Sequence, residues 1–195
     1  MKKAAGGLLV LLALYLALAS QNIGGAGAGA NTPTLSSAGG GHSVLGTPSI
    51  SSAFINRVLH AAGSPAAGLG QSLYALGVHY GIDPVFALAF FHHESSYGTT
   101  GEAKVTMSLG NERCIPDRPC IDRARGGYAL MRSWVDGFAH WYYLISTLYI
   151  GQWRRSTVES IIPKYAPGGD GNNEQAYINA VLSDVANYQA GQVVY

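Results

Sequence analysis

The feature that most constrains the fold is an uninterrupted apolar run at residues 85–91. Asp83 offers a side-chain cap and Pro84 suits the first helical position, so together they predict a helix that starts here and continues to Glu94. Because the run leaves no polar face for water, this helix belongs in a core. We therefore expect a mainly α-helical protein built around one buried central helix.

The carboxylate of Glu94 lies at the C-terminal end of this predicted helix, just before a polar turn that contains glycine. There it meets the negative end of the helix dipole, which is unfavourable by about 0.3–1 kcal/mol. Apolar surroundings would also raise its pKa, because they disfavour the charged form. A protonated, partly buried carboxyl at the edge of a cleft is what general-acid catalysis requires. The alternative is a glutamate that turns outward into solvent.

The composition bounds the class of protein. The chain has 195 residues and a formal net charge of +1, with few charged residues. This length leaves room for one domain of ordinary size behind the N-terminal segments. Nothing in the sequence forms a basic stripe, so nucleic acid is not an expected partner. The sequence also contains no glycine-rich phosphate loop and no dinucleotide-binding fingerprint.

The N-terminus has the features of an export signal. Two lysines precede an apolar stretch at residues 4–19, which ends in the small-x-small pattern of a cleavage site. The stretch is short for a membrane span, which needs about 20 residues, but if retained it would associate the chain with a membrane. We expect a signal peptide or membrane anchor over residues 1–19 and a secreted or cell-envelope-associated chain. A flexible linker rich in Gly, Ala and Ser should follow over residues 20–52, and a folded domain over residues 53–190.

Apolar residues recur at helical spacing over most of this domain. The spacing predicts further helices over residues 53–62, 68–80, 133–150, 157–165 and 173–187. Residues 95–128 lack such a period, so we expect a long irregular lobe there, with one small hairpin around residues 105–109. Loops this long inside a compact domain are usually functional.

Cysteine and histidine bear on redox and metal chemistry. Cys114 and Cys120 are the only cysteines, and they lie close together in a chain that we expect to be exported. A disulfide within the loop is the economical interpretation. His92 and His93 resemble metal ligands, but adjacent helical residues point about 100° apart, and the i, i+4 histidine spacing of zinc peptidases is absent. We therefore expect neither a metal nor an organic cofactor.

Three stretches of the sequence together resemble a known enzyme family. They are GIDPVFALAFFHHESSYGTTG at residues 81–101, SLGN at residues 108–111 and KYAPGGDGNNEQAYINAV at residues 164–181. In this order and at this separation they are similar to the glucosaminidase family of peptidoglycan hydrolases, in the lysozyme-like superfamily that also holds the soluble lytic transglycosylases. The resemblance extends over about residues 68–188. It implies a lysozyme-like α+β domain with a buried central helix and an irregular lobe that contains little β structure.

The resemblance also implies catalytic roles. Glu94 matches the general acid that protonates the glycosidic oxygen, and Tyr165 matches a tyrosine that faces this acid across the cleft. Glycosidases ordinarily need a second carboxylate, which in this family lies in the mobile lobe. The candidates are Glu102, Glu112, Asp117 and Asp122. Asp122 has the most family-like separation from Glu94, but the sequence does not decide among them. If none serves, the substrate's own acetamido oxygen or its muramyl 6-hydroxyl could take the place of the second acid.

Other matched residues are expected to bind substrate or to shape the site. Ser95 and Tyr97 match the turn that holds the general acid, and Ser108 begins the matched segment on the cleft floor. Asn111, at the end of that segment, would hydrogen-bond an acetamido group. We assign these four residues to the substrate-binding part of the site.

The sequence thus predicts an exported enzyme whose partner is the glycan strand of bacterial peptidoglycan, cleaved by hydrolysis with Glu94 as general acid. Two alternatives stay open. The first is a lytic transglycosylase, of phage or secretion-machine origin, which would release anhydro products. The second is a wall-binding module that retains the fold without turnover.

Overall fold

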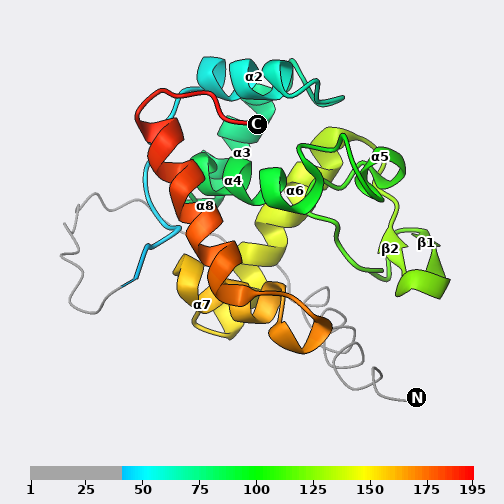
Figure 1. Ribbon diagram of the computed structural model, residues 1–195. Coiled ribbons are helices and arrows are strands. Elements are labelled where there is room, and N and C mark those ends of the chain that lie inside the picture. Colours follow the sequence, from blue (N-terminus) through cyan, green and yellow to red (C-terminus); the bar gives the residue numbers. More distant parts are fainter. Residues whose placement is uncertain (1–40) are drawn as a thin grey trace, which may run out of the picture.

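The computed structural model describes residues 41–195 (Figure 1). The predicted leader and residues 20–40 of the predicted linker lie outside the described residues. The chain is mainly helical and has one small two-stranded sheet. The larger helices are α2 (Ser52–Ala61), α3 (Gly70–Tyr80), α4 (Pro84–Ser95), α6 (Trp134–Leu144), α7 (Val158–Tyr165) and α8 (Glu174–Gln189). All six predicted helices are therefore confirmed, with shifts of a few residues at their ends.

Helix α4 is the buried central helix that the sequence predicts. The Oδ1 atom of Asp83 accepts hydrogen bonds from the backbone N–H groups of Val85 and Ser49, each at 3.1 Å, and so caps the helix start. Every residue from Pro84 to Phe91 is buried. Helix α8 packs across α4, and α3 packs against α4 as well (Figure 1). Only near its C-terminal end does α4 reach the surface, which places Glu94 at the boundary between core and solvent.

Helix α6 supplies much of the remaining core. Phe138 and Trp141 on α6 are buried, and so are Ile145 and Leu148 on the π-helical segment η2 (Ile145–Gln152) that continues it. The apolar residues that recur at helical spacing along this predicted helix therefore lie in the core. Gly137 lets the loop before the hairpin approach α6, because a Cβ atom there would lie 2.2 Å from the carbonyl oxygen of Met107.

The boundary predicted between linker and folded domain needs correction. Val44 is buried, its N–H donates to the carbonyl of Ser156 (2.8 Å), and its own carbonyl accepts from the N–H of Asp83 (3.0 Å). Residues 41–51 are thus part of the folded structure and not of the linker. The sequence does not indicate that residues 41–51 are folded, because most of them are small or polar. A segment held by backbone hydrogen bonds needs few apolar side chains of its own.

The irregular lobe differs from prediction in the position of its hairpin. Its elements are α5 (Ala103–Thr106), β1 (Cys120–Ile121), η1 (Arg123–Arg125) and β2 (Tyr128–Ala129). The predicted hairpin at residues 105–109 is wrong, because part of that stretch is helical. Strand β1 instead pairs antiparallel with β2, in the register Cys120↔Ala129. The reversal between them uses left-handed backbone at Asp122, Gly126 and Gly127 (φ 49°, 99° and 76°), which glycine tolerates best.

The disulfide predicted between Cys114 and Cys120 is present and ties β1 to the preceding loop. Gly127 passes close to it, since a Cβ atom there would lie 2.6 Å from the Cys114 sulfur. Within residues 41–195, no helix has the length and apolar character needed to cross a bilayer.

Candidate active site

Glu94 lies in the last turn of α4, with its side chain only partly exposed. The Tyr177 hydroxyl, on α8, donates to Oε1 of Glu94 at 2.5 Å. Burial raises the pKa of Glu94 above its ordinary value, although the hydrogen bonds from Tyr177 and Asn111 and the nearby charges of His93 and Arg113 oppose the rise. The side chain therefore combines two properties of a general acid, namely a pKa shifted toward neutrality and a fixed orientation.

Residues 108–111 form a loop that closes over the end of α4. The Ser95 hydroxyl donates to the carbonyl of Leu109 (2.8 Å), which anchors the middle of the loop. The Asn111 side-chain amide donates to the backbone carbonyl of Glu94, one of the helix-terminal carbonyls that lack a partner within α4. Among the described residues, Oδ1 of Asn111 is buried and has no hydrogen-bond partner. Asn111 thus lies beside the acid with an unused acceptor.

Tyr165, at the end of α7, is the third predicted residue that the structure brings to this place. Its hydroxyl donates to the carbonyl of Gly110 (2.7 Å) and accepts from the indole N–H of Trp141 (3.2 Å). Burial, and then the charges of Glu94 and Glu112, raise the pKa of Tyr165 well above its ordinary value. The charge of Glu94 thus acts on Tyr165, but the Tyr165 hydroxyl hydrogen-bonds to the loop and not to Glu94.

We expect the substitution Gly110→Ala to disturb this loop. A Cβ atom at residue 110 would lie 2.5 Å from Cδ1 of Trp141 and 2.8 Å from the Tyr165 hydroxyl. Overpacking of this kind costs about 1–3 kcal/mol, and relief by movement of the loop would displace Asn111. Urea unfolding should therefore show a lowered free energy of unfolding. The matched control is Gly169→Ala, because a Cβ atom there meets nothing within 4 Å. Equal effects of the two substitutions would contradict the close approach.

Tyr177 is a residue of the candidate site that sequence reasoning did not assign to it. It lies in the helix predicted over residues 173–187, and its hydroxyl is the hydrogen-bond partner of Glu94. A general signal was available, because a buried tyrosine hydroxyl needs a polar partner. The sequence alone does not show which partner the fold provides.

Three residues predicted to bind substrate have structural roles instead. Ser95, Tyr97 and Ser108 are at most 1% exposed. The Ser95 hydroxyl joins the turn to the loop, the Tyr97 hydroxyl contacts the Tyr188 hydroxyl, and Oγ of Ser108 accepts from the N–H of Glu112 (3.2 Å). Their burial keeps them from contact with a ligand in this structure. We therefore correct their role from substrate binding to positioning.

The carboxylates considered as second acids are all paired. Asp122 and Glu102 both form ion pairs with Arg125, and Asp117 forms one with Arg118. The structure thus joins Asp122 to its own hairpin, and no hydrogen bond or ion pair among the described residues joins it to Glu94, Asn111 or Tyr165.

Glu112 has a different environment. It is 5% exposed, and its Oε2 lies 2.5 Å from Nδ1 of His140. Its Oε1 is buried without a hydrogen-bond partner among the described residues. The charges of Glu112 and Glu94 both raise the pKa of Tyr149, after the larger effect of burial. Of the four candidates, Glu112 is therefore the one whose charge, like that of Glu94, acts on both Tyr149 and Tyr165.

Two hollows of the surface lie elsewhere. One is lined by Asn56, Arg57, His60, Ala61 and Val193. The other is lined by Tyr80, Arg118, Asp136, Ala139, His140 and Tyr143. Neither includes Glu94, so the candidate site rests on the contacts around that side chain.

A comparison of the chain with known protein families, with curated protein sequences and with solved structures finds no match.

Proposed function

We propose that this protein is an exported, lysozyme-like glycoside hydrolase that cleaves the glycan strand of bacterial peptidoglycan. The observation that carries the proposal is the position of Glu94, a partly exposed carboxyl at the end of a buried helix, with one oxygen held by the Tyr177 hydroxyl. Such a group can present a proton to a glycosidic oxygen in a fixed direction.

Two neighbours of Glu94 support a glycan as substrate. Asn111 is partly exposed, and its Oδ1 has no hydrogen-bond partner among the described residues, so a small shift of the loop would offer this buried oxygen to the N–H of an acetamido group. The Tyr165 hydroxyl donates to the carbonyl of Gly110, so it fixes the loop that carries Asn111. These positions agree with the glucosaminidase resemblance of the sequence, and the disulfide suits the oxidising surroundings of an exported protein.

The pairing of the candidate second acids favours a second reaction, that of a lytic transglycosylase. Asp122 and Glu102 are paired with Arg125, and Glu112 with His140. A single-acid route avoids the need for them. In that route Glu94 gives its proton to the leaving glycosidic oxygen. The muramyl 6-hydroxyl oxygen then bonds to the same sugar's C1 and returns a proton to Glu94.

Mass spectrometry of muropeptides distinguishes the reactions. The full chain would be incubated with purified peptidoglycan, and the new chain ends identified. Reducing N-acetylglucosamine ends support the glucosaminidase reaction, and anhydro-muramyl ends support the transglycosylase. Reducing muramic acid ends would identify a lysozyme reaction instead. Binding of peptidoglycan without new ends would show a wall-binding module and refute both enzymatic proposals.

The substitution Tyr177→Phe should change the pH dependence of cleavage. The Tyr177 hydrogen bond stabilises the charged carboxylate and so lowers the pKa of Glu94. Without that bond the pKa rises further, and Glu94 stays protonated to higher pH. A general acid is active when protonated, so the alkaline limb of the profile of kcat/KM should move to higher pH. Tyr74→Phe, on α3, serves as the control. An unchanged limb, or one moved to lower pH, would contradict the role of Tyr177.

A further inference from the structure

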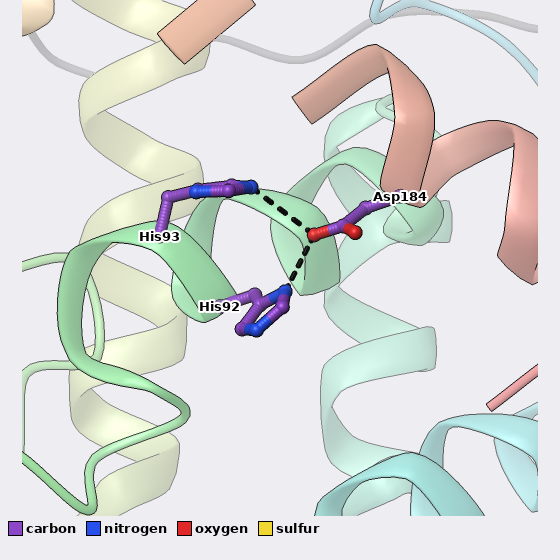
Figure 2. Close-up of side chains that lie close together, drawn as sticks. All are labelled: His92, His93 and Asp184. Carbon is purple, nitrogen blue, oxygen red and sulfur yellow. Dashed lines mark hydrogen bonds and ion pairs between the residues drawn. The ribbon is translucent and has the colours of Figure 1, made fainter. Parts of the chain in front are cut away.

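His92, His93 and Asp184 converge at the surface where α8 crosses α4. Nδ1 of His92 lies 2.6 Å from Oδ2 of Asp184, and Nε2 of His93 lies 3.2 Å from the same oxygen. Figure 2 shows both rings turned toward this carboxylate. One potential ligand atom from each of the three residues lies within 4.8 Å of the others.

The sequence-based argument against a metal at His92 and His93 relied on the different directions of their side chains, and the folded structure overcomes this difference. Adjacent helical residues do point about 100° apart. However, Asp184 comes from a different helix and lies between the two directions. His92 reaches it with the near ring nitrogen, Nδ1, and His93 with the far one, Nε2. The use of different nitrogens offsets the difference in direction.

The surroundings hold the two rings in place and leave one side open. The His92 ring stacks on Tyr97, with centroids 5.0 Å apart and planes at 7°, and the His93 ring packs against Tyr177 at 5.5 Å. The side chain of Asp184 is 10% exposed, whereas those of His92 and His93 are 24% and 26% exposed. An ion could therefore enter from solvent and keep a water molecule on its open side.

We propose that His92, His93 and Asp184 form a binding site for a divalent transition-metal ion, with Zn²⁺ as the best-fitting candidate. Two imidazoles and one carboxylate are a ligand set that Zn²⁺ accepts, with water in the fourth position. Ca²⁺ and Mg²⁺ prefer sites made of oxygen ligands. Tetrahedral bonds of about 2.0–2.1 Å place ligand atoms roughly 3.3 Å apart. The 3.2 Å separation fits this value, and the 2.6 Å separation would have to open by less than 1 Å.

The site would fix α8 against α4 beside the candidate acid. Asp184 follows Tyr177 by seven residues, so both lie on one face of α8. That face carries the ligand for the metal and the hydroxyl that holds Glu94. The metal site does not depend on which reaction Glu94 supports, because its own three residues define it.

Zinc titration of the full chain tests the site. The protein would carry no histidine tag and would first be treated with a chelator that is then removed. We expect one Zn²⁺ per chain by calorimetry and a higher Tm with the ion, because a ligand that binds the folded state stabilises it. Co²⁺ in place of Zn²⁺ should give the visible absorption of a nitrogen- and oxygen-ligated ion.

Asp184→Asn is the discriminating variant. Asparagine retains an oxygen that can accept from both histidines but loses the negative charge that the metal requires. We expect its dissociation constant for Zn²⁺ to rise at least tenfold and its Co²⁺ absorption to disappear. His60→Gln, on the exposed face of α2, should bind like the wild type. If Asp184→Asn fails to fold, as judged by near-ultraviolet circular dichroism, His93→Gln replaces it with the same expectation.

The contrary result is equally plain. If the wild type binds Zn²⁺ no more tightly than Asp184→Asn or His93→Gln, the three residues form only an internal hydrogen-bonded cluster and the proposal is overturned. The same conclusion follows if His60→Gln removes the binding, because the ion would then lie elsewhere.

Discussion

Replacing Glu94 by glutamine should reduce cleavage of peptidoglycan by about 10²- to 10⁴-fold, the usual contribution of a general acid. Glutamine has nearly the same shape as glutamate, and its Oε1 can still accept from the Tyr177 hydroxyl, which holds Glu94 at 2.5 Å. It has no carboxyl proton to give to the glycosidic oxygen. The loss should therefore appear in kcat, measured from the release of soluble fragments, while KM changes little.

Glu159→Gln is the matched control for this experiment. Glu159 is also a partly exposed glutamate and forms an ion pair with His42 at 2.7 Å. Its substitution should leave cleavage close to that of the wild type. Glu94→Gln should still sediment with peptidoglycan, since the substitution leaves the glycan contacts in place. Full activity of Glu94→Gln would remove Glu94 from the reaction.

The second large effect concerns stability. Phe91→Ala should lower the free energy of unfolding by about 3–5 kcal/mol, as expected for an aromatic residue removed from a core. Phe91 is fully buried on α4, with its ring 5.3 Å from that of Trp141 and 5.9 Å from that of Phe138. The neighbours belong to α6, and a cavity between two helices collapses only in part. The loss is a large fraction of the total stability of a typical domain.

Urea unfolding followed by circular dichroism measures this loss. Val78→Ala is the control, because Val78 is 54% exposed on α3 and alanine favours a helix. It should change the free energy of unfolding by no more than about 0.5 kcal/mol. A loss below 1 kcal/mol for Phe91→Ala would mean that α4 is not the central core helix.

The helices could be predicted from the sequence because their signals are local. The cap at Asp83, the proline after it and the apolar run at residues 85–91 together define α4 without reference to any other segment. The N-terminal boundary of the folded domain could not be predicted, since residues 41–51 are held by backbone hydrogen bonds to distant segments. The hairpin was misplaced because a pairing of two residues per strand leaves almost no apolar alternation to detect.

The candidate site, too, could be predicted only where its sequence signals are local. The position of Glu94 followed from its own helix, and the disulfide from the close spacing of two cysteines. The contacts of Tyr177 and Asp184 arise from the crossing of α8 over α4, which no local pattern encodes. For Ser95 and Tyr97 the sequence indicated the right turn but the wrong role, because burial depends on the whole fold.

The most direct test of Glu94 as a glycosidic acid is a paired digestion of purified peptidoglycan, with the products identified by mass spectrometry. The wild type and Glu94→Gln would be used at equal concentration, after circular dichroism has shown that both are folded. We predict new reducing or anhydro sugar ends with the wild type and almost none with Glu94→Gln. No new ends with the folded wild type at any pH, or equal numbers with both proteins, would contradict the proposed function.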